Sequence, residues 1–452
     1  MLSGWGRTRL SSCVVLCPRS PRELAEALSG ELARRGGVIP RGAGRSYGDA
    51  AQNDGGLVLD LTGLRGLQVL PGDPPVLRAM AGSTLSEAAA VLAADGLALP
   101  VLPGTRHVTF GGAIAADVHG KNHRVDGSFG RHVREITLCT PDGRLRNLSP
   151  QSERELFCAT IGGMGLTGAI VSATIAVRHL YAPMLPADVD RTDHIHQALE
   201  LMADDVRHRY SIAWVDLLSG GRRFGRCTVM RSNDRPAAEA LDARGELRWR
   251  LPGRRRLAVP KEFPSWVLSD QLVRAFNGLR WHRTRARPTA TLVSAGAHFF
   301  PLDALGSWNR LYGDGGLLQY QALAPDDRPE VLIEIVQRLR AARLPMYLAV
   351  IKRFGEGSGG MLSFPKPGWT IAIDLPAGAP RLHDTLDAID SWLVSEGGRV
   401  YLAKDARLRA ELMPAMYPAL DAFQRIRAAI DPDRLLRSDL SRRLGLEEVG
   451  RR

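Results

Sequence analysis

The sequence predicts an α+β protein of two domains, the first spanning residues 1–182 and completed by 399–452, the second spanning 183–398. Three observations support this prediction. The chain has 452 residues, enough for more than one buried core. Glycine clusters interrupt the strand-like and helical runs between residues 40 and 168. Beyond about residue 183 mixed strands and helices follow, as expected for a separate α+β unit.

Composition narrows the class of protein. Apolar content of 44% and charged content of 24% are typical of a globular protein. The five cysteines contain no C-x-x-C pair, so neither a disulfide framework nor a zinc site is indicated. The N-terminus has no apolar signal-peptide core, and no apolar run is long enough to span a bilayer. We expect a soluble or peripheral membrane protein, cytoplasmic by sequence.

The net charge of +12 is concentrated in one segment. Residues 244–287 contain twelve Lys or Arg and three acidic residues, together with several aromatic ones. We name this segment the basic loop. It suits contact with phosphates, an anionic membrane surface or nucleic acid. A solvated loop with no partner is the simpler alternative.

The chain begins with a predicted strand at 12–17. Ser20 and Glu23 then form a capping box, with Pro21 at the first helical position. The helix should end at Gly36-Gly37. Its buried face is predicted to contain Leu24, Leu28 and Leu32.

The first glycine cluster spans residues 40–50 and precedes a strand at 57–61. Its glycines let successive backbone N–H groups turn toward one point and bind an anion. The cluster also contains a G-x-S-x-G pattern with Ser46 as a candidate nucleophile, and the start of a dinucleotide fingerprint. Both alternatives need a helix directly after the turn, whereas residues 49–56 read as a polar loop.

A second cluster spans residues 103–123, after a predicted strand at 76–81 and a helix capped by Thr84. Gly111-Gly112 leads into a short helix of small residues, which can hold a phosphate or a flat ring. The same cluster brings together His119, Lys121, Asn122 and His123. Two histidines invite a metal interpretation, but no third ligand cluster accompanies them.

A hairpin at 136–148 and a helix capped by Ser152 lead to the third cluster, at 162–168, and a strand at 169–177. In the second domain we expect these further elements: strands at 211–215, 316–322, 346–352 and 369–374, and helices at 329–342 and 382–396. A regular tail follows, with residues 399–405 and then helices up to Leu444. Three glycine clusters on such connections suit an extended ligand with a pyrophosphate, so they favour a nucleotide cofactor.

Several motifs resemble the vanillyl-alcohol-oxidase-type flavoproteins, and among them the oxidases of polyprenyl-phosphoryl-ribose. The resemblance covers almost the whole chain. Its motifs are Arg41-Gly-Ala-Gly-Arg-Ser-Tyr-Gly-Asp49, Pro103-Gly-Thr-Arg106, His119-Gly-Lys-Asn-His123, Gly165-Leu-Thr-Gly168, Leu318-Gln-Tyr-Gln321 and Tyr401-Leu-Ala-Lys-Asp405. It implies a two-subdomain FAD-binding (PCMH/vanillyl-alcohol-oxidase-type) domain and an α+β substrate-binding domain with an antiparallel sheet. FAD would be bound without a covalent link.

The resemblance also implies site residues. Those for the cofactor are Arg41, Gly42, Ala43, Gly44, Arg45, Ser46, Tyr47, Gly48, Gly104, Thr109, Gly111, Gly112, Ala116, His119, Ile170 and Tyr401. Those for the substrate are Lys121, Trp214, Gln319, Gln321, Lys352, Thr370, Ala372 and Lys404. Lys404, His119 and Tyr47 are the candidate catalytic bases, because loss of hydride from an alcohol carbon requires removal of the hydroxyl proton.

The implied reaction is oxidation of the 2′-hydroxyl of a polyprenyl-phosphoryl-β-D-ribose to the 2′-keto sugar, the first half of epimerisation to the arabinose form. A separate NAD-dependent short-chain reductase would complete it, and the family has been placed at the periplasmic face of the membrane. Thr370 and Ala372 replace an Asn and a Cys common in the family, and Phe299 replaces a Tyr. Because of these departures, the resemblance does not define which sugar the protein oxidises.

Three alternatives remain: a sugar, sugar-lactone or alditol oxidase of the same fold, a serine hydrolase using Ser46, and a non-catalytic binder of polyprenyl phosphate or nucleic acid. For the oxidase we expect peripheral membrane contact and no nucleic-acid partner.

Overall fold

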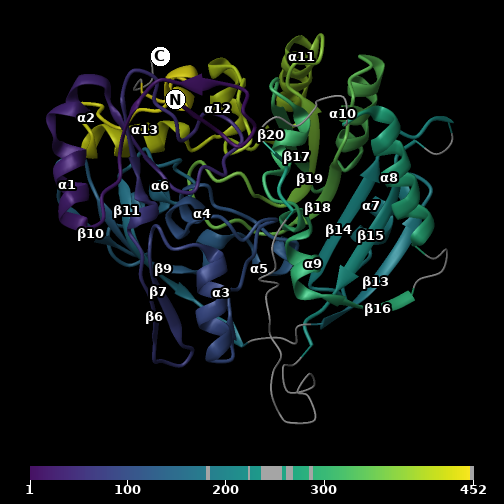
Figure 1. The fold of residues 1–452 in the computed structure, drawn as a ribbon, viewed down its shortest axis with the longest axis horizontal. Coiled ribbons are helices and arrows are strands. Elements are labelled where there is room, and N and C mark those ends of the chain that lie inside the picture. Colours follow the sequence, from purple (N-terminus) through teal and green to yellow (C-terminus); the bar gives the residue numbers. More distant parts are fainter. Residues whose placement is uncertain (180–183, 222–223, 236–256, 261–267, 285–288, 448–452) are drawn as a thin grey trace.

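The computed structural model describes residues 1–452 except 180–183, 222–223, 236–256, 261–267, 285–288 and 448–452. Among the described residues, three sheets carry the fold. Figure 1 shows two of them on one side of the molecule, together with both termini, and the third on the other side. The predicted α+β class is confirmed, as is the antiparallel sheet of the second domain.

The smallest of the three sheets is parallel, in the order β3 (Val14–Leu16), β5 (Leu57–Asp60) and β4 (Val38–Arg41). Helices α1 (Pro21–Ser29) and α2 (Glu31–Gly36) precede β4. Ser20 caps α1 as predicted, and Leu24 and Leu28 are completely buried. Leu32, however, is 45% exposed, so its predicted burial is wrong. The helix breaks at Gly30, whose backbone is extended, and the new helix buries Ala33 instead.

The second sheet is antiparallel and has the order β10-β9-β11-β7-β6. Its strands are β6 (Leu67–Leu70), β7 (Val76–Met80), β9 (Val133–Cys139), β10 (Leu145–Leu148) and β11 (Ala169–Ala176). Helix α3 (Leu85–Ala94) begins with the Thr84–Glu87 capping box. Helix α6 (Arg154–Thr160) instead starts at Glu153, which is left-handed at φ 52°, and has no side-chain cap. The predicted Ser152 cap is therefore wrong, since Ser152 N is held in a turn by Ser149.

The third sheet has eight strands in the order β16-β13-β15-β14-β18-β19-β17-β20. They are β13 (Met184–Thr192), β14 (Tyr210–Asp216), β15 (Arg226–Ser232), β16 (Thr289–Ser294), β17 (Leu317–Pro325), β18 (Ala349–Phe354), β19 (Gly368–Pro376) and β20 (Arg399–Val400). Helices α7 (Ile195–Ala203), α10 (Glu330–Ala341) and α11 (Leu382–Ser395) pack against these strands. On β14, Ala213 and Val215 are buried in the core, whereas Ile212 and Trp214 line a cavity. This alternation leaves one face of the sheet for a ligand.

Two predictions within the second half of the chain are corrected. The described part of the basic loop includes helix α8 (Asp270–Arg283), which begins at Ser269, so this part is not a loop. The rest of the loop lies mostly outside the described residues. In the tail, only Arg399–Val400 forms a strand before the chain turns, whereas the predicted helices up to Leu444 are present.

The C-terminal residues contact the parallel sheet and the first glycine cluster. This segment contains helices α12 (Met413–Met416), α13 (Leu420–Ile430) and α14 (Asp439–Arg443), of which α12 and α13 lie in the upper part of Figure 1, and α13 contacts α6. Leu436 forms a parallel bridge with Val38 of β4. Arg443 of α14 forms ion pairs with Asp49 at 2.8 Å and with Asp405 at 2.9 Å. These contacts fix the first glycine cluster against the C-terminal segment.

None of the helices in the described residues is both long and apolar enough to cross a membrane.

Candidate active site

A cavity of about 750 Å³ lies between the glycine clusters and the exposed face of the eight-stranded sheet. This is a usual volume for a small-molecule site. Of the residues predicted for cofactor, substrate or catalysis, all but Gly48 and Thr370 line it. Gly48 packs so closely on the Asp405 carbonyl that a side chain would collide with it. Thr370 is buried behind the wall, where it donates to the Ala322 carbonyl at 2.8 Å.

The first glycine cluster forms a wall of backbone and small side chains. A side chain at Gly42 would collide with Thr109, the residue that caps helix α4 (Phe110–Ala115). Gly44 has a left-handed backbone with φ 62°, which favours glycine. Arg41 supports this loop, because its guanidinium donates to the backbone carbonyls of Ala51 and Ser3 at 2.9 and 2.8 Å. A loop of this kind can bind a pyrophosphate through backbone N–H groups.

The residues that line the cavity fit FAD, because backbone N–H groups are available for its pyrophosphate. The lining of the cavity includes Gly42, Gly44, Gly111 and Gly112, and also Gly104, where a Cβ would meet no atom within 4 Å. The buried Nδ1 of His119 in its wall has no hydrogen-bond partner among the described residues. A backbone-lined pyrophosphate site that continues into a wider pocket with polar groups is what an elongated dinucleotide requires.

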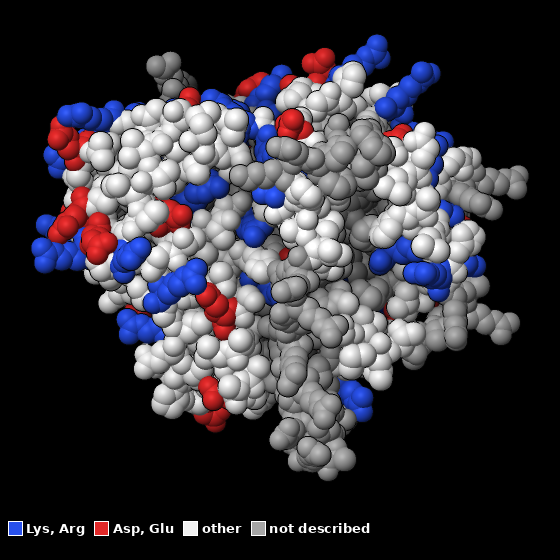
Figure 2. All heavy atoms as spheres, viewed as in Figure 1, with Lys and Arg blue, Asp and Glu red and all other residues white. Residues whose placement is uncertain are grey.

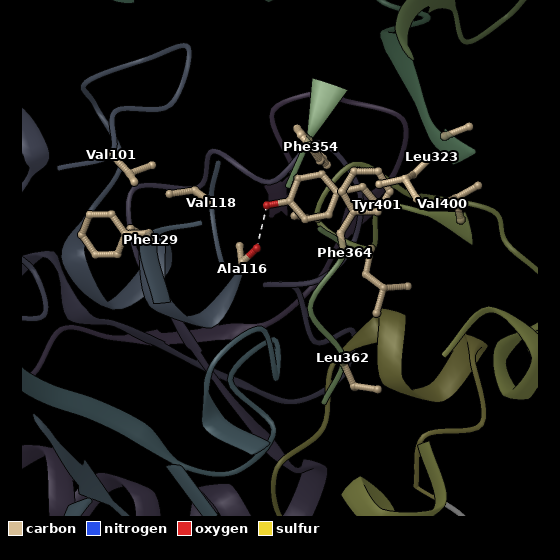
Figure 3. Close-up of a cluster of buried hydrophobic side chains, with 14 of the residues drawn as sticks. Val101, Ala116, Val118, Phe129, Leu323, Phe354, Leu362, Phe364, Val400 and Tyr401 are labelled. Atoms are coloured by element: carbon tan, nitrogen blue, oxygen red, sulfur yellow. Dashed lines mark hydrogen bonds between the residues drawn. The ribbon is translucent and has the colours of Figure 1, made fainter. Parts of the chain in front are cut away.

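Tyr401 joins the C-terminal segment to the second glycine cluster, as Figure 3 shows. Its hydroxyl donates to the Ala116 carbonyl at 2.7 Å, and its ring stacks on Phe364 with centroids 4.8 Å apart. The Phe354 ring lies 4.8 Å from that of His119. These contacts hold the His119 wall of the cavity against the eight-stranded sheet.

Lys404 lies at the centre of the polar part of the cavity. Its Nζ is 3.5 Å from the centroid of the Tyr47 ring. Burial lowers the Lys404 pKa to about 7, although the nearby Asp374 carboxylate acts in the opposite direction. At neutral pH a substantial fraction of this amine is therefore uncharged and can accept a proton.

Asp374, which is close to Lys404, is linked by hydrogen bonds to Gln319 and Tyr312. It accepts hydrogen bonds from Gln319 Nε2 and, at 3.3 Å, from the Tyr312 hydroxyl. Gln319 Nε2 also reaches the Tyr47 hydroxyl at 3.4 Å. Burial raises the pKa of Asp374, and it raises the pKa of Tyr47 well above its usual value. The Tyr47 phenol therefore keeps its proton and does not serve as a base near neutral pH.

Two further lysines line the same cavity. Burial lowers the Lys352 pKa to about 8 and the Lys121 pKa to about 7. Lys121 donates to the His298 carbonyl. No ion pair with an acidic side chain is described for either lysine among the described residues. An anionic ligand would stabilise the charged form of both amines, so this pocket favours a substrate with a phosphate.

His119 is neutral in this site. Its pKa is lowered well below the usual value, first by burial and then by the charge of Lys352. Gln321 Nε2 lies 3.0 Å from His119 Nε2 and 3.3 Å from the Thr370 hydroxyl. In this arrangement the amide donates to Nε2, so the ring proton is on Nδ1. Among the three candidate bases, the geometry therefore favours Lys404.

His119 and His123 do not form a metal site with other described residues. Their ring centroids are 6.4 Å apart, and His123 Nδ1 accepts from Gly355 N at 3.2 Å. No group of three or more His, Cys, Asp or Glu side chains in the described part of the chain could hold a metal ion. Ser46 Oγ has no described hydrogen bond to a histidine, so the arrangement of a nucleophile and base is also lacking there.

Sequence reasoning missed three residues of the cavity region. Asp374 supports its polar part, while Arg280 and Trp308 line it directly. Asp374 could have been found as the charged residue that ends an apolar strand run. Arg280 lies within the basic loop, where its sequence context does not distinguish it from its neighbours. Trp308 has no motif that marks it.

Comparison with known proteins defines the class. A profile of the FAD binding domain matches residues 13–149. Together with the glycine-lined cavity, this match identifies an FAD-dependent oxidoreductase and confirms the predicted cofactor.

Full-length relatives identify the family. Decaprenylphosphoryl-beta-D-ribose oxidase of Mycolicibacterium smegmatis is 37% identical over 449 residues, covering 98% of this chain and 97% of that protein. The chain therefore belongs to the decaprenylphosphoryl-beta-D-ribose oxidase family, as the motifs predicted. An uncharacterised Streptomyces coelicolor protein is 38% identical over 80% of this chain and 100% of its own length. L-gulono-1,4-lactone dehydrogenase of Mycobacterium tuberculosis is 23% identical over 98% of each chain.

Proposed function

We propose that this protein oxidises the 2′-hydroxyl of a polyprenyl-phosphoryl-β-D-ribose to the 2′-keto sugar, with FAD as its cofactor. The observation that carries this proposal is the convergence of Lys121, Lys352 and Lys404 with Gln319 and Gln321 on one cavity beside the glycine loop. Lysines suit a phosphate and glutamines suit sugar hydroxyls. The name of the Mycolicibacterium smegmatis relative supports the same substrate class.

The cofactor would lie along residues 41–47, with the second glycine cluster and Tyr401 on its other sides. Gly42, Gly44, Gly111 and Gly112 allow the close approach of the backbone. When bound, FAD supplies the acceptor for the substrate hydride.

The protein's own residues would then carry out positioning and proton transfer. Lys352 and Lys121 bind the phosphate of the substrate, and Gln319 and Gln321 orient the ribose. The uncharged Lys404 amine accepts the proton of the 2′-hydroxyl, for which its lowered pKa is suited. The neutral Tyr47 and His119 hold this region in shape and offer hydrogen-bond donors.

Oxidation to the 2′-keto sugar is only the first of the two steps of an epimerisation. We infer that a separate NAD-dependent reductase returns a hydride to it and yields the arabinose form. The present sequence carries no complete dinucleotide fingerprint of its own. Because the substrate has a lipid chain, we also infer that the protein binds peripherally to a membrane, a contact that the surplus of basic residues in the segment 244–287 favours.

The proposal is tested with FAD-loaded protein and a short-chain polyprenyl-phosphoryl-β-D-ribose dispersed in detergent. Reduction of the product with borodeuteride should place deuterium at C2 of ribose and arabinose. L-gulono-1,4-lactone and an alditol serve as competing substrates. A higher kcat/KM for either of these, with no deuterium at C2 of the pentose, would contradict the proposed substrate and favour a lactone or alditol oxidase.

A further inference from the structure

Helix α8 faces the protein with the apolar side chain of Val273 and with two polar residues. Its Asn277 is buried, accepting from Trp214 Nε1 and donating to Asp216 Oδ1, both at 3.2 Å. The Arg280 guanidinium lies 4.5 Å from the centroid of the Trp214 ring and lines the cavity. The side of α8 that faces the protein therefore holds an amide and a guanidinium beside the site.

The adjacent side of α8 is apolar and exposed, although the ring of Phe276 at its edge lies 6.1 Å from that of Trp214. Leu272, Phe276 and Leu279 are 50%, 53% and 53% exposed. Their spacing of four and three residues aligns them along one face of the helix, and we call them the α8 apolar stripe. A helix on the surface of a globular protein normally buries such a stripe and exposes its polar residues. Helix α8 buries Val273 in this way but leaves three large apolar side chains exposed in a row, which indicates that something else covers the stripe.

The charges on α8 indicate which kind of partner covers the α8 apolar stripe. Arg283 lies one turn beyond Leu279 on the same face, and Arg274 is exposed on the flank of the helix. Neither arginine forms an ion pair with a described residue, and Arg274 donates only to the Leu218 carbonyl, at 2.8 Å. The one acidic residue of α8 is Asp270, in its first turn. Figure 2 shows Lys and Arg side chains along the flank of the molecule on which α8 lies.

We propose that the α8 apolar stripe inserts into the surface of an anionic lipid bilayer, with Arg274 and Arg283 on the lipid phosphates. Apolar side chains between basic ones on one exposed helix are the features of an interfacial helix. The other side of α8 lines the cavity, so a docked helix holds the cavity against the membrane that contains the lipid-linked substrate. This inference rests on the proposed function and specifies the contact surface that the function requires.

Co-sedimentation of the FAD-loaded full chain with vesicles tests the proposal. The vesicles contain either equal parts of phosphatidylglycerol and phosphatidylcholine or phosphatidylcholine alone. The stripe variant, L272S/L279S, keeps Phe276 because its ring packs against Trp214, and it should bind the anionic vesicles about tenfold more weakly than the unchanged protein. R274Q/R283Q should lose binding on the order of tenfold for anionic vesicles only.

The control is V206S/L145S, which removes two apolar side chains that are 81% and 52% exposed on other surfaces. It should bind as the unchanged protein does. All variants change exposed positions, so the flavin absorbance should be retained and report intact folding.

The outcomes separate this proposal from the proposed function. Turnover of detergent-dispersed substrate tests the reaction without a bilayer and should be the same in the stripe variant. Equal vesicle binding by the stripe variant and the unchanged protein would overturn the membrane contact, whatever the turnover shows. A stripe variant that instead dissociates a dimer, with no vesicle binding by the unchanged protein, would assign the stripe to an interface between two copies.

Discussion

Replacing Asp374 by Asn tests the assignment of Lys404 as the base. In the unchanged protein burial lowers the Lys404 pKa to about 7, and the Asp374 carboxylate raises it against that effect. Removing the carboxylate should therefore lower the Lys404 pKa further, by about one for the loss of a close opposite charge. The asparagine side chain still accepts a hydrogen bond in place of the carboxylate.

The size of the effect follows from the fraction of uncharged amine. At about pH 6 that fraction is about one tenth for a pKa of about 7, and about one half once the pKa has fallen by about one. We express the second-order rate constant of anaerobic flavin reduction as a fraction of its plateau at high pH. At about pH 6 this fraction should be about fivefold larger in the Asp374→Asn variant than in the unchanged protein.

The assay is stopped-flow reduction of the bound flavin by the lipid-linked pentose across a pH series. Tyr312→Phe is the matched control, since it removes a hydrogen bond to Asp374 but keeps the carboxylate charge. Its profile should keep the midpoint of the unchanged protein. An Asp374→Asn midpoint that stays the same or moves to higher pH would refute the base assignment.

Four further predictions concern single residues. Lys352→Met should raise the free energy of unfolding by up to about 3 kcal/mol near neutral pH in urea titrations, because burial lowers the Lys352 pKa from 10.5 to about 8 and its protonation therefore opposes folding. That gain should shrink as the pH rises above about 8, and a constant gain would contradict it. His119→Gln should slow flavin reduction but leave the pH midpoint unchanged, since His119 is already neutral; a moved midpoint would implicate His119 as the base. Gly42→Ala should lower the ratio of FAD to protein measured by absorbance, because a Cβ collides with Thr109, while Gly220→Ala, which meets no neighbour, should not. Ser46→Ala should retain flavin reduction by substrate, whereas complete loss with FAD still bound would revive a catalytic role for Ser46.

The sequence was informative where local chemistry decides structure. Ser20 and Thr84 start the predicted helices because their side chains satisfy free backbone N–H groups. Leu32 was misplaced because its apolar spacing continues across Gly30, and only the three-dimensional break rotates it outward. Helix α8 was missed because its apolar face points to the exterior, so its pattern does not indicate a normal surface helix.

The candidate site was predictable only in part, because motifs identify residues but not their charge states. Glycine clusters and the resemblance of motifs identified the residues that line the cavity from segments far apart in the chain. Their charge states could not be read from the sequence. The neutral Tyr47, the lowered pKa of Lys404 and the role of Asp374 depend on burial and on neighbours that only the fold brings together.

Flavin bleaching with a labelled substrate tests the central claim most directly. FAD-loaded protein is mixed anaerobically with the polyprenyl-phosphoryl-ribose carrying either hydrogen or deuterium at C2. The account predicts that the flavin absorbance bleaches in a single turnover and that deuterium slows this bleaching. Bleaching at equal rates with both substrates, or no bleaching by a protein that holds FAD, would contradict oxidation at the 2′ position.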